Sequence, residues 1–153
     1  MKLSGMFLNR LKSVFWIPIL FIIFFTGTAS AERLAVKASM ANIRSGPGTS
    51  YDVLWEVEKY HPFLIIDKKD KWYRFRDFEG DEGWIDKSLL GDIKTVITIK
   101  NTCSIRKGPG KEYDILFTTG KGIPFKVLEQ EGGWIHVEHA DGDKGWIYKT
   151  LVW

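Results

Sequence analysis

The sequence is poor in cysteine, with Cys103 as its single thiol among 153 residues. One cysteine cannot form an internal disulfide, so packing alone has to stabilise any fold that this chain adopts. An internal repeat, described below, places Ala41 at the equivalent position. We therefore expect Cys103 to be a small buried residue and not a reactive thiol.

The chain also lacks net charge once its N-terminal segment is set aside. Lys2, Arg10 and Lys12 form a basic start, followed by an uncharged apolar run and by small residues ending at Ala31. This is the layout of a secretory signal peptide, so we predict a signal peptide over residues 1–31, cleavage after Ala31 and an exported location, in the periplasm or the cell envelope. An uncleaved anchor is the alternative, because counting the uncharged residues through Ala31 approaches the roughly 20 that span a bilayer.

Cleavage removes three basic residues and no acidic ones, which changes the totals from 22 basic and 19 acidic residues to 19 of each. Nucleic-acid binding normally needs a net basic face, and attraction to anionic lipid needs the same. We therefore expect no nucleic-acid partner, and no stable membrane insertion after cleavage of the leader.

No segment after Ala31 has a sustained apolar period of 3.6 residues. The segments "FLIID" (63–67) and "FKVLE" (125–129) are short and apolar, while "WYRFR" (72–76) and "WIHVE" (134–138) alternate with a period of two. Turns rich in Gly and acidic residues follow the alternating segments and suit hairpins. The sequence thus predicts an all-β fold, with single helical turns at most in "DKSLL" and "YKTLV".

The chain carries the same unusual string twice. "IRSGPGTSYDVLW" (43–55) returns as "IRKGPGKEYDILF" (105–117), 62 residues later, and the offset holds without a gap for 58 pairs, of which 19 are identical. The identities fall on turn formers and large apolar residues, which are the positions that a fold requires. We therefore predict a tandem duplication, with a first repeat over residues 32–91 and a second repeat over residues 94–153.

Four motifs recur in order in both repeats: an aliphatic-Arg-x-Gly-Pro-Gly string, an aromatic residue shortly after it, a Trp in mid-repeat, and a Gly-Trp-aliphatic-x-Lys-Ser/Thr-Leu ending. These motifs resemble the bacterial SH3-like domain of exported envelope proteins, over almost all of residues 34–153. Ser104 departs from the pattern, where the family and Asn42 have Asn. The resemblance implies two tandem five-stranded SH3-like β-barrels that serve as binding modules, some of them helping cell-wall hydrolases to engage peptidoglycan.

The sequence contains few residue patterns that are typical of an enzyme, a metal site or a cofactor site. No Gly-x-Ser-x-Gly elbow is present, and both repeats together leave no room in this chain for a separate catalytic domain. His136 and His139 invite a metal hypothesis, but residues three apart on a strand point to opposite faces. We expect no catalytic residues, no metal site and no cofactor.

The aromatic residues carry the stronger signal of function. Period-two alternation places Tyr73 and Phe75 on one face and Trp72 on the charged, outer face, and it places Trp134 likewise. If the barrels follow the Src-homology-3 pattern, each repeat has one groove. Tyr51 and Trp55 then line the groove of Trp72, and Tyr113 lines the groove of Trp134. The full candidate set for ligand binding comprises Tyr51, Trp55, Trp72, Trp84, Tyr113, Trp134 and Trp146, together with Arg44 and Arg106.

The Gly-Pro-Gly string itself has mainly a structural interpretation. Proline fixes its φ angle, and the flanking glycines permit backbone angles closed to other residues, so the string predicts a stiff loop between strands. Two roles are possible for Arg44 and Arg106, which stand beside the string. Each can pair with a carboxylate, Asp52 or Asp114, or bind an anionic group of a ligand.

Two functions fit these expectations. The first is an exported, non-catalytic tandem module that binds peptidoglycan or its peptide stems, with two weak sites gaining avidity from their linkage. The alternative is an adaptor whose grooves recognise an extended segment of another envelope protein.

Overall fold

A computed structural model describes residues 31–153 of the chain. The predicted signal peptide, apart from Ala31, lies outside the described residues. Within residues 31–153, no helix has the length and apolar character needed to cross a bilayer.

The first repeat forms an antiparallel sheet with the strand order β3-β2-β6-β5-β4-β1-β7. Its strands are β1 (Glu32–Val36), β2 (Met40–Arg44), β3 (Val53–Glu58), β4 (Pro62–Lys69), β5 (Trp72–Arg76), β6 (Glu82–Asp86) and β7 (Leu90–Gly91), with the 3-10 helix η1 (Lys87–Leu89) before β7.

The second repeat forms a separate antiparallel sheet with the order β10-β9-β13-β12-β11-β8. Its elements are β8 (Thr95–Ile97), β9 (Cys103–Arg106), β10 (Ile115–Thr119), β11 (Pro124–Glu131), β12 (Trp134–Glu138), β13 (Lys144–Tyr148) and η2 (Lys149–Leu151). An isolated bridge between Thr98 and Val152 stands where the first repeat has β7.

The two repeats make the same local departures from ideal geometry. Positive φ angles occur at Asp70 (54°) and Gly132 (57°), which are 62 residues apart and turn β4 into β5 and β11 into β12. Register shifts fall between Ile65 and Asp67 in β4 and at the equivalent place in β11. Such bulges increase the local twist, so both long strands bend at the same point. The predicted duplication therefore extends to backbone conformation.

Each sheet encloses its own apolar core. The first core is centred on Phe63 and Phe75, whose ring centroids lie 3.7 Å apart. The second core contains Phe125 and Val137 at these two positions, and Cys103 is fully buried in it. The prediction that Cys103 is buried is confirmed, as is the inward direction of Tyr73 and Phe75.

The all-β prediction is confirmed, but the closed five-stranded barrel is not. Among residues 31–153 the strand pairing leaves both sheets open, with β3 and β7 at the edges of the first sheet and β10 and β8 at the edges of the second. The sheets have seven and six strands, not five each, and in both the Gly-Pro-Gly segment connects the two strands of a hairpin, β2–β3 or β9–β10.

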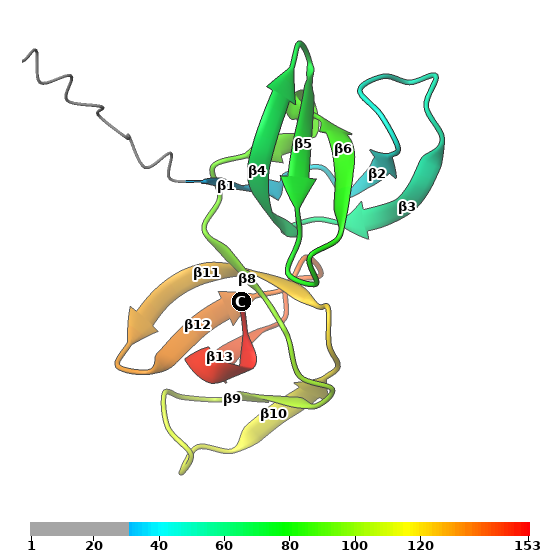
Figure 1. Cartoon of the computed structure of the whole chain (residues 1–153). Coiled ribbons are helices and arrows are strands. Elements are labelled where there is room, and N and C mark those ends of the chain that lie inside the picture. Colours follow the sequence, from blue (N-terminus) through cyan, green and yellow to red (C-terminus); the bar gives the residue numbers. More distant parts are fainter. Residues whose placement is uncertain (1–30) are drawn as a thin grey trace, which may run out of the picture.

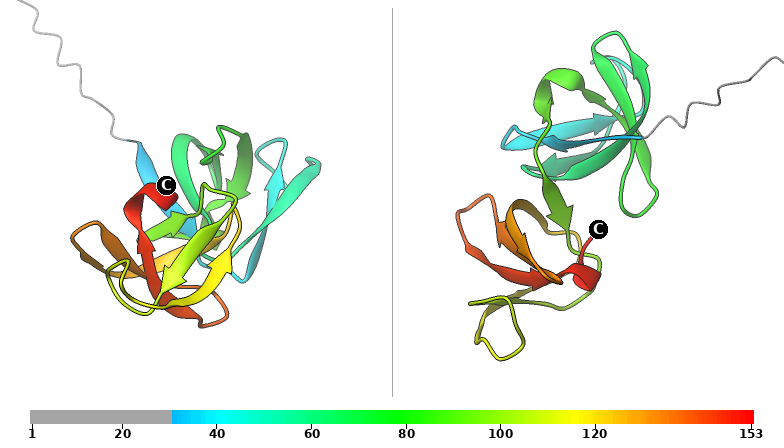
Figure 2. Two further views of the ribbon diagram at one scale, coloured as in Figure 1. Left: turned by 90° about the horizontal axis from the view of Figure 1, so that it is seen from below. Right: turned by 90° about the vertical axis from the view of Figure 1, so that its left-hand side faces the viewer.

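The two sheets lie one above the other, joined by the short segment between β7 and β8 (Figure 1; Figure 2). The turn between β5 and β6 points from the first sheet toward the second (Figure 1). Its Glu79 forms an ion pair with Lys121, and on another side Arg33 donates a hydrogen bond of 3.0 Å to the carbonyl oxygen of Trp153. The repeats are thus in contact, and not merely tethered.

Candidate functional site

Each repeat has a groove between its Gly-Pro-Gly loop and the strand that begins with the mid-repeat Trp. The first groove has a volume of about 300 Å³ and is bounded by Arg44, Thr49, Trp72, Asp86 and Leu89. The second groove has a volume of about 740 Å³, and its wall is made by Arg106, Lys111, Trp134, Tyr148 and Leu151. These five positions are related one to one by the offset of 62 residues. The duplication has therefore produced one groove twice.

Trp72 and Trp134 stand at the first positions of β5 and β12 and are half-buried. Both lie on the face of the strand opposite the buried Phe75 and Val137, as the alternation of the sequence predicts. The structure thus places the two Trp residues that we considered the best candidates in equivalent grooves.

Arg44 and Arg106 hold the loops that form the other wall. The Nη1 atom of Arg44 donates to the carbonyl oxygens of Thr49 (3.1 Å) and Tyr51 (2.8 Å). Arg106 makes the equivalent bonds to Lys111 (3.2 Å) and Tyr113 (2.8 Å). The pairing with Asp52 or Asp114 that we considered does not form, because each loop curls back and brings its carbonyl groups to the guanidinium.

Tyr51 and Tyr113 cover the loops and do not line either groove. A Cβ atom added to Gly46 would lie 2.2 Å from a carbon of the Tyr51 ring, and one added to Gly108 would lie 2.5 Å from the Tyr113 ring. Only glycine permits this approach. Both phenol rings remain exposed on their outer side, so their role is mainly to stiffen the loop that the Arg residue holds.

The second groove has an aromatic floor that the first groove lacks. The ring of Tyr148 meets Trp134 edge to face, with 5.2 Å between centroids. Tyr148 reaches this position because residue 133 is glycine, where a Cβ atom would lie 2.5 Å from the phenol ring. In the first repeat the equivalent residues are Asp86 and Lys71.

Asp86 gives the first groove a different character. Its carboxylate accepts a hydrogen bond of 2.8 Å from the amide of Ser88 and caps η1. Glu56 adds a second carboxylate to the wall. The first groove is therefore smaller and acidic, whereas the second is wider, and its aromatic pair is accompanied by Arg106 and Lys111.

Trp84 and Trp146 lie beside the grooves and not in them. Trp84 is half-buried on β6 between Arg44 and Arg74 on the neighbouring strands. Trp146 is buried, because the ring of His136 stacks flat on it at 4.8 Å. The expectation that both rings line a groove is corrected: neither ring borders the grooves, Trp146 is covered by His136, and Trp84 is half-buried outside the first groove.

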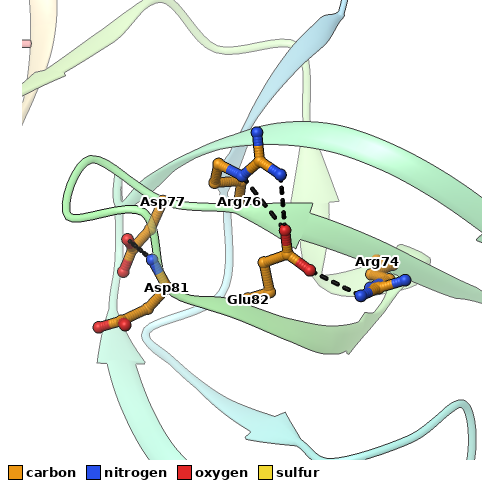
Figure 3. A network of polar contacts seen from close by, with 5 residues as sticks. All are labelled: Arg74, Arg76, Asp77, Asp81 and Glu82. Atoms are coloured by element: carbon orange, nitrogen blue, oxygen red, sulfur yellow. Dashed lines mark hydrogen bonds and ion pairs between the residues drawn. The ribbon is translucent and has the colours of Figure 1, made fainter.

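The outer face of β5 and β6 also carries an ion-pair network, drawn in Figure 3. Glu82 accepts hydrogen bonds of 2.7 Å from Arg76 and 2.7 Å from Arg74. Arg76, and to a smaller extent Arg74, hold the pKa of Glu82 below its usual range. The three side chains are at the surface, so the network contributes little to stability.

Trp55 lies away from both grooves, which corrects the expectation that it shares a groove with Trp72. It stands on β3 with its edge toward Phe75 (6.4 Å between centroids) and borders a different recess, which faces the second repeat. The alternation along β3 places Trp55 on the same side as the buried Val57 and Phe75, whereas Trp72 lies on the opposite face of β5.

Sequence reasoning missed Tyr148 and Asp86, which stand at equivalent positions and decide how the two grooves differ. Each comes two residues after the Trp of the Gly-Trp motif, and period two puts it on the same face as the Trp of the neighbouring strand. This position next to a Trp on the neighbouring strand could have identified both residues. The prediction requires the register between the strands, which the sequence does not give.

Cys103 and the histidines were the groups that the sequence offered for catalysis or for a metal ion. Burial raises the pKa of the Cys103 thiol, which disfavours the nucleophilic thiolate. His139 contacts Asp141 at 2.9 Å, and the pKa of that carboxyl is lowered, first by the Asp143 amide and then by His139. Among residues 31–153, no three His, Cys, Asp or Glu side chains gather closely enough to hold a metal ion.

The sequence was compared with those of known protein families and proteins. A family model described as "Bacterial SH3 domain" matches residues 37–92 and again residues 100–153. A protein of Bacillus subtilis, provisionally named N-acetylmuramoyl-L-alanine amidase YrvJ, is 26% identical over 144 residues, covering 87% of this chain and 28% of its own length. A Staphylococcus epidermidis protein, provisionally named cell wall amidase LytH, is 38% identical over 52 residues, covering 33% of this chain and 18% of its own length.

The chain therefore spans less than a third of the length of these curated relatives. Among solved structures, an NlpC/P60 family protein from Bacillus cereus has a TM-score of 0.38 at 14% identity, covering 80% of this chain and 56% of the other. NlpC2 from Trichomonas vaginalis has a TM-score of 0.37 at 11% identity, covering 81% and 48%. Scores this low establish no shared overall arrangement. The family model, by contrast, matches both repeats across most of the chain, and the chain belongs to the bacterial SH3 domain family.

Proposed function

We propose that the chain is an exported, non-catalytic module of the bacterial cell envelope that binds peptidoglycan or its peptide stems. It would consist of a signal peptide over residues 1–31 and two SH3-like domains, residues 32–91 and 94–153, each an SH3-like barrel that is partly open. The observation that carries the proposal is the repeated groove, with a half-buried Trp on one wall and an Arg-braced loop on the other.

The second groove is the better candidate for the principal site. Trp134 and Tyr148 offer two adjoining aromatic surfaces of the kind that bind extended peptides and sugar rings, because each presents apolar area at low cost in side-chain entropy. Its wall also carries Arg106, Lys111 and Glu112, so the groove has partners for the carboxylates and amides of a peptide.

The two loops lie at opposite ends of the molecule in Figure 1. A small ligand cannot reach both grooves at once, whereas a polymer with repeated binding sites can. Two weak sites on one polymer increase the overall affinity through effective concentration, without any new contact. This arrangement favours a polymeric ligand such as the cell wall, and the relatives named as cell-wall amidases support the same choice.

Co-sedimentation with purified peptidoglycan sacculi tests the proposal. Both buried cores are made from residues 31–153, so that segment can be used. We expect Trp134→Ala and Tyr148→Ala to reduce binding about tenfold or more, while Leu128→Ala, an exposed apolar residue of the same repeat, leaves it unchanged. Absence of sedimentation above a neutral control protein, or equal binding by all variants, refutes the proposal.

A second candidate, an adaptor for another envelope protein, is favoured by a separate observation. The edge strands β3 and β10 expose equivalent apolar residues, namely Val53 and Leu54 in one and Ile115 and Leu116 in the other. Such edges can accept an added strand from a partner. A pull-down from envelope extract with Leu116→Lys as the control tests it: a partner retained equally by this variant counts against the adaptor.

A further inference from the structure

A further recess lies where the first repeat faces the second, and it adjoins the first groove at Met40 and Glu56. It has a volume of about 660 Å³ and is bordered by β3, by the turn between β5 and β6, and by Gly122 of the second repeat. The ring of Trp55 and the ring of Phe78 form part of its wall. We call it the inter-repeat recess.

Five carboxylates surround the inter-repeat recess: Glu56, Glu58, Asp77, Glu79 and Asp81. Asp77 stabilises the turn between β5 and β6, because its Oδ1 atom accepts a hydrogen bond of 2.9 Å from the amide of Glu79. The same atom accepts a second bond of 2.9 Å from the amide of Asp81, which Figure 3 shows. Glu58 lies 3.8 Å from His139. Within the part of the chain that the structure describes, the carboxylates of Glu56 and Asp81 form no hydrogen bond or ion pair. The recess therefore has negatively charged groups that no cation of the described chain neutralises.

His61 adds an independent observation. The residue is buried, with a relative exposure of 8%, and it lines the same recess. Its Nε2 atom is buried and has no hydrogen-bond partner among residues 31–153. Burial lowers the pKa of His61 to about 4, so the ring is neutral at pH 7 and can offer a lone pair. A buried polar atom without a partner costs about 1–3 kcal/mol, and a ligand that supplies a donor relieves this cost.

One ammonium group of the chain itself lies against two residues of the recess wall, Glu79 and Phe78. The Nζ atom of Lys121 pairs with Glu79 and lies 5.8 Å from the centroid of the Phe78 ring. A carboxylate combined with the face of an aromatic ring is the usual environment of a bound ammonium. Lys121 thus shows, at the rim of the recess, which chemistry its wall recognises.

The equivalent recess of the second repeat keeps carboxylates at the positions of Glu79 and Asp81, namely Asp141 and Asp143, but differs along the strand and loop that face them. Phe117 replaces Trp55, Thr118 replaces Glu56 and Ile123 replaces His61, while Gly120 stands at the position of Glu58. The duplication preserved the shape of the fold here and changed the chemistry. The fold therefore does not require Glu56, Glu58 or His61.

We propose that the inter-repeat recess is a second binding site, which takes a primary ammonium group at the end of an alkyl chain, as in a lysine-type side chain. An ammonium group carries three N–H donors and no acceptor, which matches Glu56, Glu58 and the Nε2 atom of His61. The apolar stem of the ligand would lie against Trp55. The site is independent of the second groove, and it shares Met40 and Glu56 with the wall of the first groove.

A nuclear magnetic resonance titration of residues 31–153 tests the proposal, with Nα-acetyl-lysine N-methylamide as the probe. We expect saturable shifts of the Trp55 indole N–H and the His61 ring nitrogens. The Nε-acetylated form of the probe, which has no ammonium, should produce neither. The Trp134→Ala variant should respond like the unaltered chain, which separates this site from the second groove.

The variants Glu56→Gln and Glu58→Gln, combined, should weaken probe binding about tenfold or more, because the neutral amides keep the shape and remove the charge. Glu131→Gln removes one exposed carboxylate from the second repeat and should leave the affinity unchanged. Dispersed spectra of the double variant verify that it folds. The proposal is overturned if no saturable shift occurs, if the acetylated probe binds equally, or if the double variant retains full affinity.

Discussion

The guanidinium group of Arg33 lies 3.9 Å from the centroid of the Trp153 ring, and its Nη2 atom donates to the carbonyl oxygen of the same residue. These residues are 120 positions apart and belong to the first strand of one repeat and the last residue of the other. Trp153 is itself fixed to the second sheet by two backbone hydrogen bonds with Ile97, of 2.9 and 3.1 Å. The contact therefore joins two ordered surfaces.

Replacement of Arg33 by Ala should let the repeats move independently. A partly buried cation–π contact contributes about 1–2 kcal/mol, so we expect Tm to fall by about 2–8 °C. In ¹⁵N relaxation measurements, the two repeats should tumble with different and shorter correlation times. Arg76→Ala, which breaks an exposed pair within the first repeat, is the control. Unchanged tumbling of the Arg33 variant would contradict a bracing role.

Removal of the Arg106 side chain should loosen one loop and leave its sister loop intact. The two bonds from Nη1 to the carbonyl groups of Lys111 and Tyr113 are at the surface, so their loss should cost about 1 kcal/mol. Hydrogen exchange in Arg106→Ala should accelerate at residues 107–114 and stay constant at residues 45–52. Lys107→Ala is the control for loss of charge. Equal hydrogen exchange in the two loops of the Arg106 variant would show that the Arg106 side chain does not stabilise its loop.

These contacts mark the limit of what the sequence could predict. Alternation located the strands and the inward side of Phe75, and the Gly-rich segments located the hairpins, because both depend on neighbours along the chain. The partners of Arg44 depend on how the loop curls back, which no local pattern states. Trp84 and Trp146 occupy the same position, yet only Trp146 is buried, because His136 stacks on it where Arg74 does not. The site therefore depended on cross-strand register, which the local pattern leaves open.

The thiol of Cys103 should react only when the protein unfolds. It is fully buried, and burial raises its pKa, so both access and ionisation oppose reaction. Labelling with a thiol reagent at pH 8 should be slow in buffer and complete in denaturant. Cys103→Ala copies the sister residue Ala41 and should cost about 1 kcal/mol, as removal of a small buried atom does. Rapid labelling of the folded chain would contradict this prediction.

Gly133 should control the shape of the second groove. The variant Gly133→Lys installs the residue found at the equivalent position of the first repeat, and its Cβ atom would displace the ring of Tyr148 from Trp134. We expect binding of sacculi to fall about as far as in Tyr148→Ala, with little loss of stability, because the ring is at the end of a side chain that can move. The reverse exchange, Lys71→Gly in the first repeat, is the control and should leave binding nearly unchanged, since Asp86 has no ring to place. Full binding by Gly133→Lys would show that the aromatic pair is not needed.

The ring of His61 should make the fold sensitive to pH between about 6.5 and 4. Its pKa is about 4 in the folded chain, because of burial, against 6.5 in the unfolded chain. Above pH 6.5 the ring is neutral in both states, whereas at lower pH the unfolded chain takes up a proton that the folded chain rejects. The free energy of unfolding therefore decreases as the pH falls, by up to about 3 kcal/mol near pH 4.

The carboxylates of Glu58, Asp77, Glu79 and Asp81, and the ammonium of Lys121, surround the same recess, so the contribution of His61 has to be isolated by difference. The variant His61→Ile carries the residue that the second repeat has at this position, and it cannot titrate. Urea unfolding of both chains from pH 8 to pH 4.5 should give a stability difference that is constant above pH 7 and grows in favour of Ile as the pH falls. The value at pH 8 measures the effect of exchanging the ring itself. Parallel stability curves across this range would mean that His61 is protonated as easily in the folded chain as in the unfolded one.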